Sequence, residues 1–203
     1  MNPLTGALTA ARRGWPVFPL RPCQKRPRPE LTAWETVATT SSDRIWWWWR
    51  RHPDDNVAIA TGPAGLVVVD LDLAAPDEPR PAEHPDARGG IDVFGALAAE
   101  HGYVPGSTWT VETPSGGRHL YFRAPATGGP WRNTAGRLGW HIDTRAAGGY
   151  VLAAGSMIGG RHYTVVHDRP PIELPAWIAQ CLTAVPPPAP ASPGHGSAPE
   201  GRG

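Results

Sequence analysis

Residues 66–72 read Leu66-Val67-Val68-Val69-Asp70-Leu71-Asp72, an apolar run that ends in two acidic residues. Such a run of β-branched residues predicts a strand. Successive side chains of a strand point to opposite faces of a sheet, so Val68, Asp70 and Asp72 share one face. The end of this strand therefore projects two carboxylates side by side.

Two carboxylates this close repel each other unless a proton or a cation neutralises them, and a hard divalent cation suits oxygen ligands. Asp70 and Asp72 therefore indicate one half of a metal site. An Asp-X-Asp sequence is also an ordinary polar strand end that enters a loop, so the spacing alone leaves both interpretations open.

Turn residues divide the sequence on either side of this strand into short elements. Further strands are expected over residues 15–20, 56–61, 108–113, 118–124, 140–145, 150–154 and 163–166. Helices are expected over residues 4–13, 43–51, 91–101 and 175–182. Because helices are interspersed among more numerous strands, the sequence predicts the α/β class, of the α+β type, with a largely antiparallel sheet.

The 203 residues suffice for one domain with its own core, which we place at residues 1–184. Within this domain, the Pro-rich and charged residues 74–89 are expected to form a surface insertion or loop. Residues 185–203 are rich in Pro and Gly and lack apolar periodicity, so they predict a disordered tail.

The composition argues against a disulfide-rich, zinc-binding or membrane-spanning protein. Cys23 and Cys181 are the only cysteines, which supports neither a disulfide framework nor a zinc site. No run approaches the roughly 20 apolar residues of a membrane span, so we expect a cytoplasmic protein with no membrane partner. The first 52 residues carry nine basic and three acidic residues, a net +6 that suggests an anionic partner. Lys25 is the only lysine, and under such an arginine bias a solvated basic surface also explains the charge.

A second motif follows at Thr113-Pro114-Ser115-Gly116-Gly117-Arg118-His119-Leu120-Tyr121-Phe122. Its turn, Ser115-Gly116-Gly117, combines a hydroxyl with glycines that expose backbone amides, which suits a phosphate cradle. His119 follows with the basic neighbour Arg118. A single histidine is most often a structural residue, but beside this turn a phosphate contact is an open interpretation.

The third motif is His141-Ile142-Asp143-Thr144-Arg145, in which alternation brings Asp143 and Arg145 to one face. The two can form an ordinary surface ion pair. Alternatively, Asp143 is a third carboxylate that completes a site for two metals roughly 3.5–4 Å apart, as in enzymes that displace phosphoryl groups in line.

In this order, the three motifs resemble the bifunctional primase-polymerase domain of the archaeo-eukaryotic primase superfamily. The resemblance extends to Gly148-Gly149-Tyr150-Val151 and upstream to Gly14-Trp15-Pro16-Val17-Phe18-Pro19-Leu20 and Lys25-Arg26-Pro27. It covers about residues 5–180. It implies an RRM-like catalytic sheet with flanking helices, joined to an N-terminal α/β unit.

The resemblance also implies roles for these residues. Asp70, Asp72 and Asp143 would bind catalytic Mg²⁺ or Mn²⁺. His119 would contact the phosphates of the incoming nucleotide, with help from Ser115, Gly116, Gly117, Arg118 and Arg145. The implied activity is template-directed nucleotidyl transfer by a DNA primase or polymerase in replication or repair. The implied partners are nucleoside triphosphates, a single-stranded or primed DNA template and a separate replicative helicase.

Two alternative functions stay open. A metal-dependent phosphodiesterase or nuclease needs the same carboxylates without the phosphate cradle. A nucleotide- or single-strand-binding module that has lost catalysis could partner a helicase, although the intact acids at all three motifs argue against such a loss.

The run Trp46-Trp47-Trp48-Trp49 belongs to none of the three site motifs, although the resemblance also extends to this Trp-rich helix and to residues 56–62 after it. Four consecutive helix positions point in every direction, so the four side chains cannot all be buried on one face. Core packing of two indoles is one interpretation. Base stacking by an exposed indole flanked by Arg44, Arg50 and Arg51 is the other.

Overall fold

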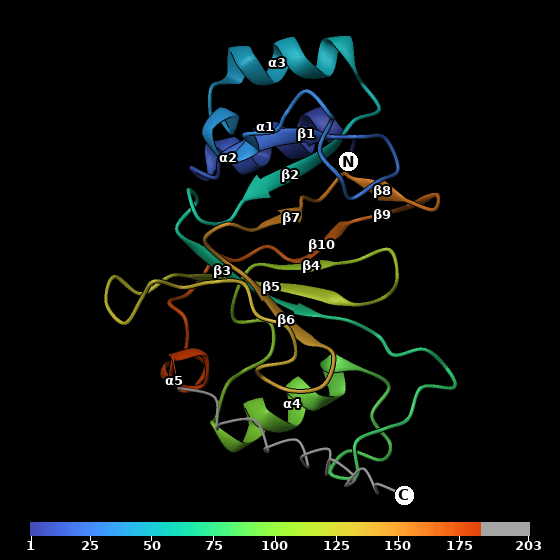
Figure 1. Cartoon of the computed structure of the whole chain (residues 1–203), viewed down its shortest axis with the longest axis vertical. Coiled ribbons are helices and arrows are strands. Elements are labelled where there is room, and N and C mark those ends of the chain that lie inside the picture. Colours follow the sequence, from blue (N-terminus) through green and yellow to red (C-terminus); the bar gives the residue numbers. More distant parts are fainter. Residues whose placement is uncertain (184–203) are drawn as a thin grey trace, which may run out of the picture.

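The computed structural model describes residues 1–183 and combines helices with antiparallel sheets, which confirms the α+β class (Figure 1). A five-stranded sheet forms its centre, with the strand order β10-β4-β5-β3-β6. All its pairs are antiparallel. Its strands are β3 (Leu66–Leu71), β4 (Thr110–Glu112), β5 (Arg118–Arg123), β6 (Ile142–Arg145) and β10 (Thr164–His167).

A second sheet of three strands belongs to the N-terminal unit, in the order β1-β2-β7. Its strands are β1 (Val17–Leu20), β2 (Asn56–Ala60) and β7 (Tyr150–Leu152). The helices of this unit are α1 (Pro3–Arg12), α2 (Trp34–Val37) and α3 (Ser42–Arg51). The unit is not contiguous in sequence, because β7 returns from the later half of the chain to pair with β2. A short ribbon of β8 (Met157–Ile158) and β9 (Arg161–His162) follows β7.

The central sheet is buried on both faces. Val68 and Tyr121 belong to an apolar cluster that the sheet shares with the N-terminal unit. Val69 and Phe122 belong to a second cluster on the opposite face, beneath α4 (Gly90–Glu100) and α5 (Ala176–Thr183). The alternation predicted for residues 66–72 is therefore confirmed, and Figure 1 shows the helices α4 and α5 on the side of the sheet away from α1 and α3.

Local signals in the sequence explain where helix α3 begins and where helix α4 ends. The side chain of Ser41 accepts a hydrogen bond from the backbone N–H of Arg44 and caps α3. Helix α4 ends just before Gly102, which adopts a left-handed φ of 64°. Both ends agree with the sequence-based prediction to within two residues.

Residues 74–89 leave the central sheet after β3 and return to its end. They contain no helix or strand, and the backbone N–H of Ala74 donates to the carbonyl of Arg88 at 3.0 Å. The predicted tail, residues 185–203, lies outside the described residues. Within residues 1–183, no helix is long and apolar enough to cross a membrane.

Candidate active site

Asp70 lies at the centre of the candidate site because of the register of three strands. On β5 its cross-strand partner is His119, and on β6 its partner is Asp143. Directly opposed residues of antiparallel strands project to the same face with Cβ atoms about 5 Å apart. The sheet therefore brings these three side chains together, on the face that looks toward the N-terminal unit.

His119 and Asp70 form a buried pair. The His119 Nε2 lies 3.3 Å from the Asp70 Oδ1, and the two side chains are 7% and 16% exposed. Burial raises the pKa of the Asp70 carboxyl, but the contact with His119 opposes this effect. The nearby charges of Arg145 and Lys25 act in the same direction as His119, so the pKa of Asp70 is held below its ordinary value.

Asp72 follows β3 and lies half-buried at its end. Its backbone N–H donates to the carbonyl of His141 at 3.0 Å, which fixes this end of the strand beside β6. Burial raises the pKa of the Asp72 carboxyl, and the negative charge of Asp70 raises it further. Asp143 contributes in the same sense, so the three carboxylates lie close enough to repel one another.

Asp143 already has two partners. Its Oδ1 accepts a hydrogen bond from the backbone N–H of Gly136, and its Oδ2 pairs with Arg145 Nη2, both at 3.1 Å. The ion pair that the alternation of residues 141–145 allows is therefore present. It also places a guanidinium beside the three carboxylates.

The closest partner of Asp70 Oδ1 is His119 Nε2 at 3.3 Å, and two further buried polar atoms, His119 Nδ1 and the Tyr121 hydroxyl, have no hydrogen-bond partner among the described residues. A buried carboxylate with one histidine as its partner has lone pairs left for a cation or another donor. Three neighbouring carboxylates are the ligands that Mg²⁺ or Mn²⁺ prefers. The residues thus fit such an ion in type. Within residues 1–183, no group of three or more His, Cys, Asp or Glu side chains is arranged so that it could hold a metal ion.

Asp70 and His119 line a cavity of about 280 Å³ between the central sheet and the N-terminal unit. Two cationic side chains line this cavity: Lys25, from the loop after β1, and Arg145, from β6. Tyr150, Tyr163 and the backbone of Gly148 and Gly149 also line it. Asp70 is the one carboxylate among the described residues that line the cavity, and neither Asp72 nor Asp143 lines it. The cavity therefore combines one carboxylate with cationic and aromatic side chains, which suits an anionic, partly aromatic ligand.

The hairpin Ser115-Gly116-Gly117 lies beside the end of β3 but does not line this cavity. Its turn is closed by a hydrogen bond from the Gly116 N–H to the Thr113 carbonyl at 2.9 Å, and the Ser115 hydroxyl lies 3.0 Å from that of Thr113. Arg118 alternates with His119 and so points to the opposite face of β5. A phosphate contact by Ser115, Gly116, Gly117 or Arg118 stays a prediction.

Sequence reasoning missed several lining residues, among them Lys25, Asn133, Tyr150 and Tyr163. Two of them carried a usable signal: Lys25 and Tyr150 lie in stretches that resemble the family, and Lys25 is also the single lysine of an arginine-rich chain. Asn133 acts on the backbone: its Oδ1 accepts from the Ala146 N–H at 2.8 Å and its Nδ2 donates to the Gly148 carbonyl at 3.2 Å. It thereby fixes the loop that forms one wall of the cavity.

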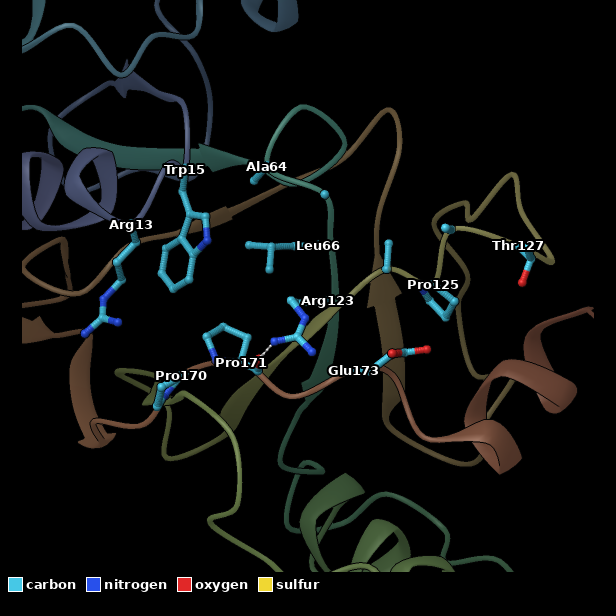
Figure 2. A pocket seen from close by; sticks show the side chains of 13 residues that line it. Arg13, Trp15, Ala64, Leu66, Arg123, Pro125, Thr127, Pro170, Pro171 and Glu173 are labelled. Atoms are coloured by element: carbon cyan, nitrogen blue, oxygen red, sulfur yellow. Dashed lines mark hydrogen bonds between the residues drawn. The ribbon is translucent and has the colours of Figure 1, made fainter.

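A larger cavity, of about 630 Å³, lies at the opposite ends of β3 and β5, next to Leu66 and Arg123 (Figure 2). Its two cationic side chains among the described residues already have partners. Arg13 pairs with Asp168 at 2.8 Å, and Arg123 donates to the Pro171 carbonyl at 3.1 Å. Its one acidic lining residue in the same part of the chain, Glu173, is exposed. The smaller cavity is therefore the better candidate for chemistry, despite its size.

Fold and cavity together define an α+β protein whose central antiparallel sheet presents the Asp70 carboxylate to a cavity with two cationic side chains. The family model described as "Bifunctional DNA primase/polymerase, N-terminal" matches residues 7–177. The chain therefore belongs to this family of primase/polymerase-type nucleotidyltransferases, as the resemblance of the motifs predicted. No curated protein matches the sequence.

Proposed function

We propose that the chain catalyses template-directed nucleotidyl transfer, in which a 3′ hydroxyl attacks the α-phosphorus of a nucleoside triphosphate and pyrophosphate leaves. One observation carries this proposal: the register that sets Asp70 between His119 and Asp143 at the edge of a cavity with two cationic side chains. Membership of the primase/polymerase family supports the same reaction class.

The residues of the cavity divide into two groups by charge. Lys25, Arg145 and His119 would bind and orient the triphosphate, which carries up to four negative charges, within the cavity. Tyr150 and Tyr163 would pack beside the nucleoside. Positioning and charge neutralisation, rather than a covalent intermediate on the protein, would lower the barrier.

The carboxylates would hold the metal ions that this family uses. Asp70, Asp72 and Asp143 fit Mg²⁺ or Mn²⁺, which when bound neutralises the phosphates and favours ionisation of the attacking hydroxyl. The register that sets Asp70 directly opposite Asp143, with Asp72 two residues further along the chain, supports this assignment. A single-stranded or primed DNA template would be the second substrate, and a separate helicase stays a predicted partner.

The test is primer extension with labelled nucleotides, a primed and an unprimed single-stranded template, and Mg²⁺ or Mn²⁺. We expect Asp70→Asn to lower extension at least about 100-fold, because the variant removes a charge that would bind the metal. Asp54→Asn, which makes the same change at an exposed position, should leave extension unchanged.

Two other outcomes of this assay would assign a different function to the chain. Shortening of the template strand, lost in Asp70→Asn, would identify a nuclease. Nucleotide or DNA binding without any product, with either metal and at high protein concentration, would reduce the chain to a binding module.

A further inference from the structure

Helix α3 carries the tryptophan run on the outer side of the N-terminal unit, at the end of the molecule away from α4 and α5 (Figure 1). Two of the four indoles are used by the fold. Trp49 is buried and its Nε1 donates to the carbonyl of Asp55 at 2.8 Å, and Trp48 packs half-buried against the same apolar cluster. Trp46 and Trp47 remain 47% and 53% exposed, which core packing does not explain.

Each exposed indole has an arginine four residues further along the helix. Trp46 precedes Arg50 by four residues and Trp47 precedes Arg51 by four, so two parallel rows of an indole and a guanidinium run along the outer face. The Arg51 guanidinium lies 4.0 Å from the centre of the Trp47 ring. The two rows and Asp43 border a shallow hollow of about 620 Å³.

Neighbouring aromatic faces and guanidinium groups match the chemistry of single-stranded nucleic acid. Indoles stack on unpaired bases of any identity, and arginines pair with the phosphates between them. Helix α3 has three arginines and one acidic residue, and the first 52 residues carry a net +6. A second copy of the chain would bring a like-charged patch against this one, which electrostatics disfavours.

We propose that Trp46, Trp47, Arg50 and Arg51 form a secondary binding surface for single-stranded DNA, separate from the catalytic cavity. The inference rests on the proposed function, since a template-directed enzyme has a single strand to hold. The surface would bind without regard to sequence, would prefer a single strand over a duplex, and would lose affinity as salt rises.

Binding of the full chain to a labelled oligothymidylate of about 20 nucleotides tests this surface, measured by fluorescence anisotropy without nucleotide and with EDTA. Trp46→Ala should weaken binding about 5- to 150-fold, the range for loss of one stacked base, and Trp46→Phe should retain most of the affinity. Arg50→Glu should weaken binding and reduce the slope of log K against log salt by about 0.7, the value for one phosphate contact on a single strand. Arg169→Glu makes the same charge change at an exposed residue outside the surface and should have a much smaller effect.

Two results would overturn the proposal: oligonucleotide affinity unchanged in both Trp46→Ala and Arg50→Glu, or a dimer in sedimentation that Trp46→Ala dissociates. The primer-extension assay separates this proposal from the proposed function. If the chain extends primers but substitutions in α3 do not change its affinity for DNA, only the proposed surface is refuted. If substitutions in α3 weaken DNA binding but the chain extends no primer, the proposed reaction is refuted and the proposed surface is supported.

Discussion

At the scale of single residues, Asp72 shows how neighbouring carboxylates work against the stability of the fold. Its carboxyl is half-buried at the end of β3, and burial together with the charges of Asp70 and Asp143 raises its pKa. Lys25 and His119 act in the opposite direction without outweighing these effects, so the pKa of Asp72 stays raised. An ionised Asp72 therefore destabilises the folded chain at neutral pH.

Asp72→Asn should accordingly raise the melting temperature at pH 7 in EDTA, by roughly 2–4 °C, while lowering primer extension. The pKa of Asp72 is raised in the folded state, so the unfolded state loses the proton at lower pH and the cost is fully present above the folded-state pKa. Below the ordinary pKa of 3.8 both states are protonated and the advantage of the variant disappears. Melting curves of both proteins between pH 4 and pH 8 measure this, and a variant that melts lower at pH 7 would contradict it.

At the scale of elements, the β4–β5 hairpin depends on a glycine next to β3. A Cβ atom on Gly117 would lie 2.4 Å from the carbonyl oxygen of Leu71, which neither strand can relieve without moving. Because His119 follows two residues later on β5, such a shift also displaces the candidate site.

Gly117→Ala should therefore destabilise the chain by about 1–3 kcal/mol and lower primer extension. Gly95→Ala is the matched control, because Gly95 lies within α4 and has open space around the position of a Cβ atom. There alanine should stabilise the fold by about 0.5–1 kcal/mol. Urea denaturation of both variants checks the opposite signs, and equal effects would refute the steric argument.

The helices and strands were predicted from the sequence more successfully than the way they pair in space. Alternation at Val67, Val68 and Val69 was sufficient to place strand β3 and its two faces, because period-two burial is a local property. The pairing of β7 with β2 was not predicted, since no local pattern records a partner some 90 residues away. For the same reason the position of Lys25 in the wall of the cavity was not predicted. The family resemblance did point to Asp70, His119 and Asp143 as candidate site residues.

At the scale of the whole molecule, aromatic packing joins the N-terminal unit to the central sheet. The ring of Trp15 stacks on Tyr121 at a centroid distance of 5.4 Å and meets Trp109 edge-on at 5.7 Å. All three side chains are buried. The candidate cavity lies between the same two layers, so its shape depends on their contact.

Trp15→Ala should cost about 3–5 kcal/mol and lower the melting temperature by roughly 10 °C or more. Trp46→Ala removes an equally large side chain from an exposed position and should shift melting by about 2 °C at most. Thermal unfolding followed by circular dichroism compares the two, and similar shifts would show that the layers do not depend on this contact.

Lys25 offers a direct reporter on the cavity, because it is exposed and is the only lysine in the chain. An amine-acylating reagent can modify one side chain and the α-amino group, so mass spectrometry of the digested protein would resolve a single internal adduct. A bound nucleoside triphosphate should slow acylation of Lys25 and leave that of the α-amino group unchanged. Equal rates with and without nucleotide would show that Lys25 does not contact the bound ligand, and the protein would need no engineered label for the measurement.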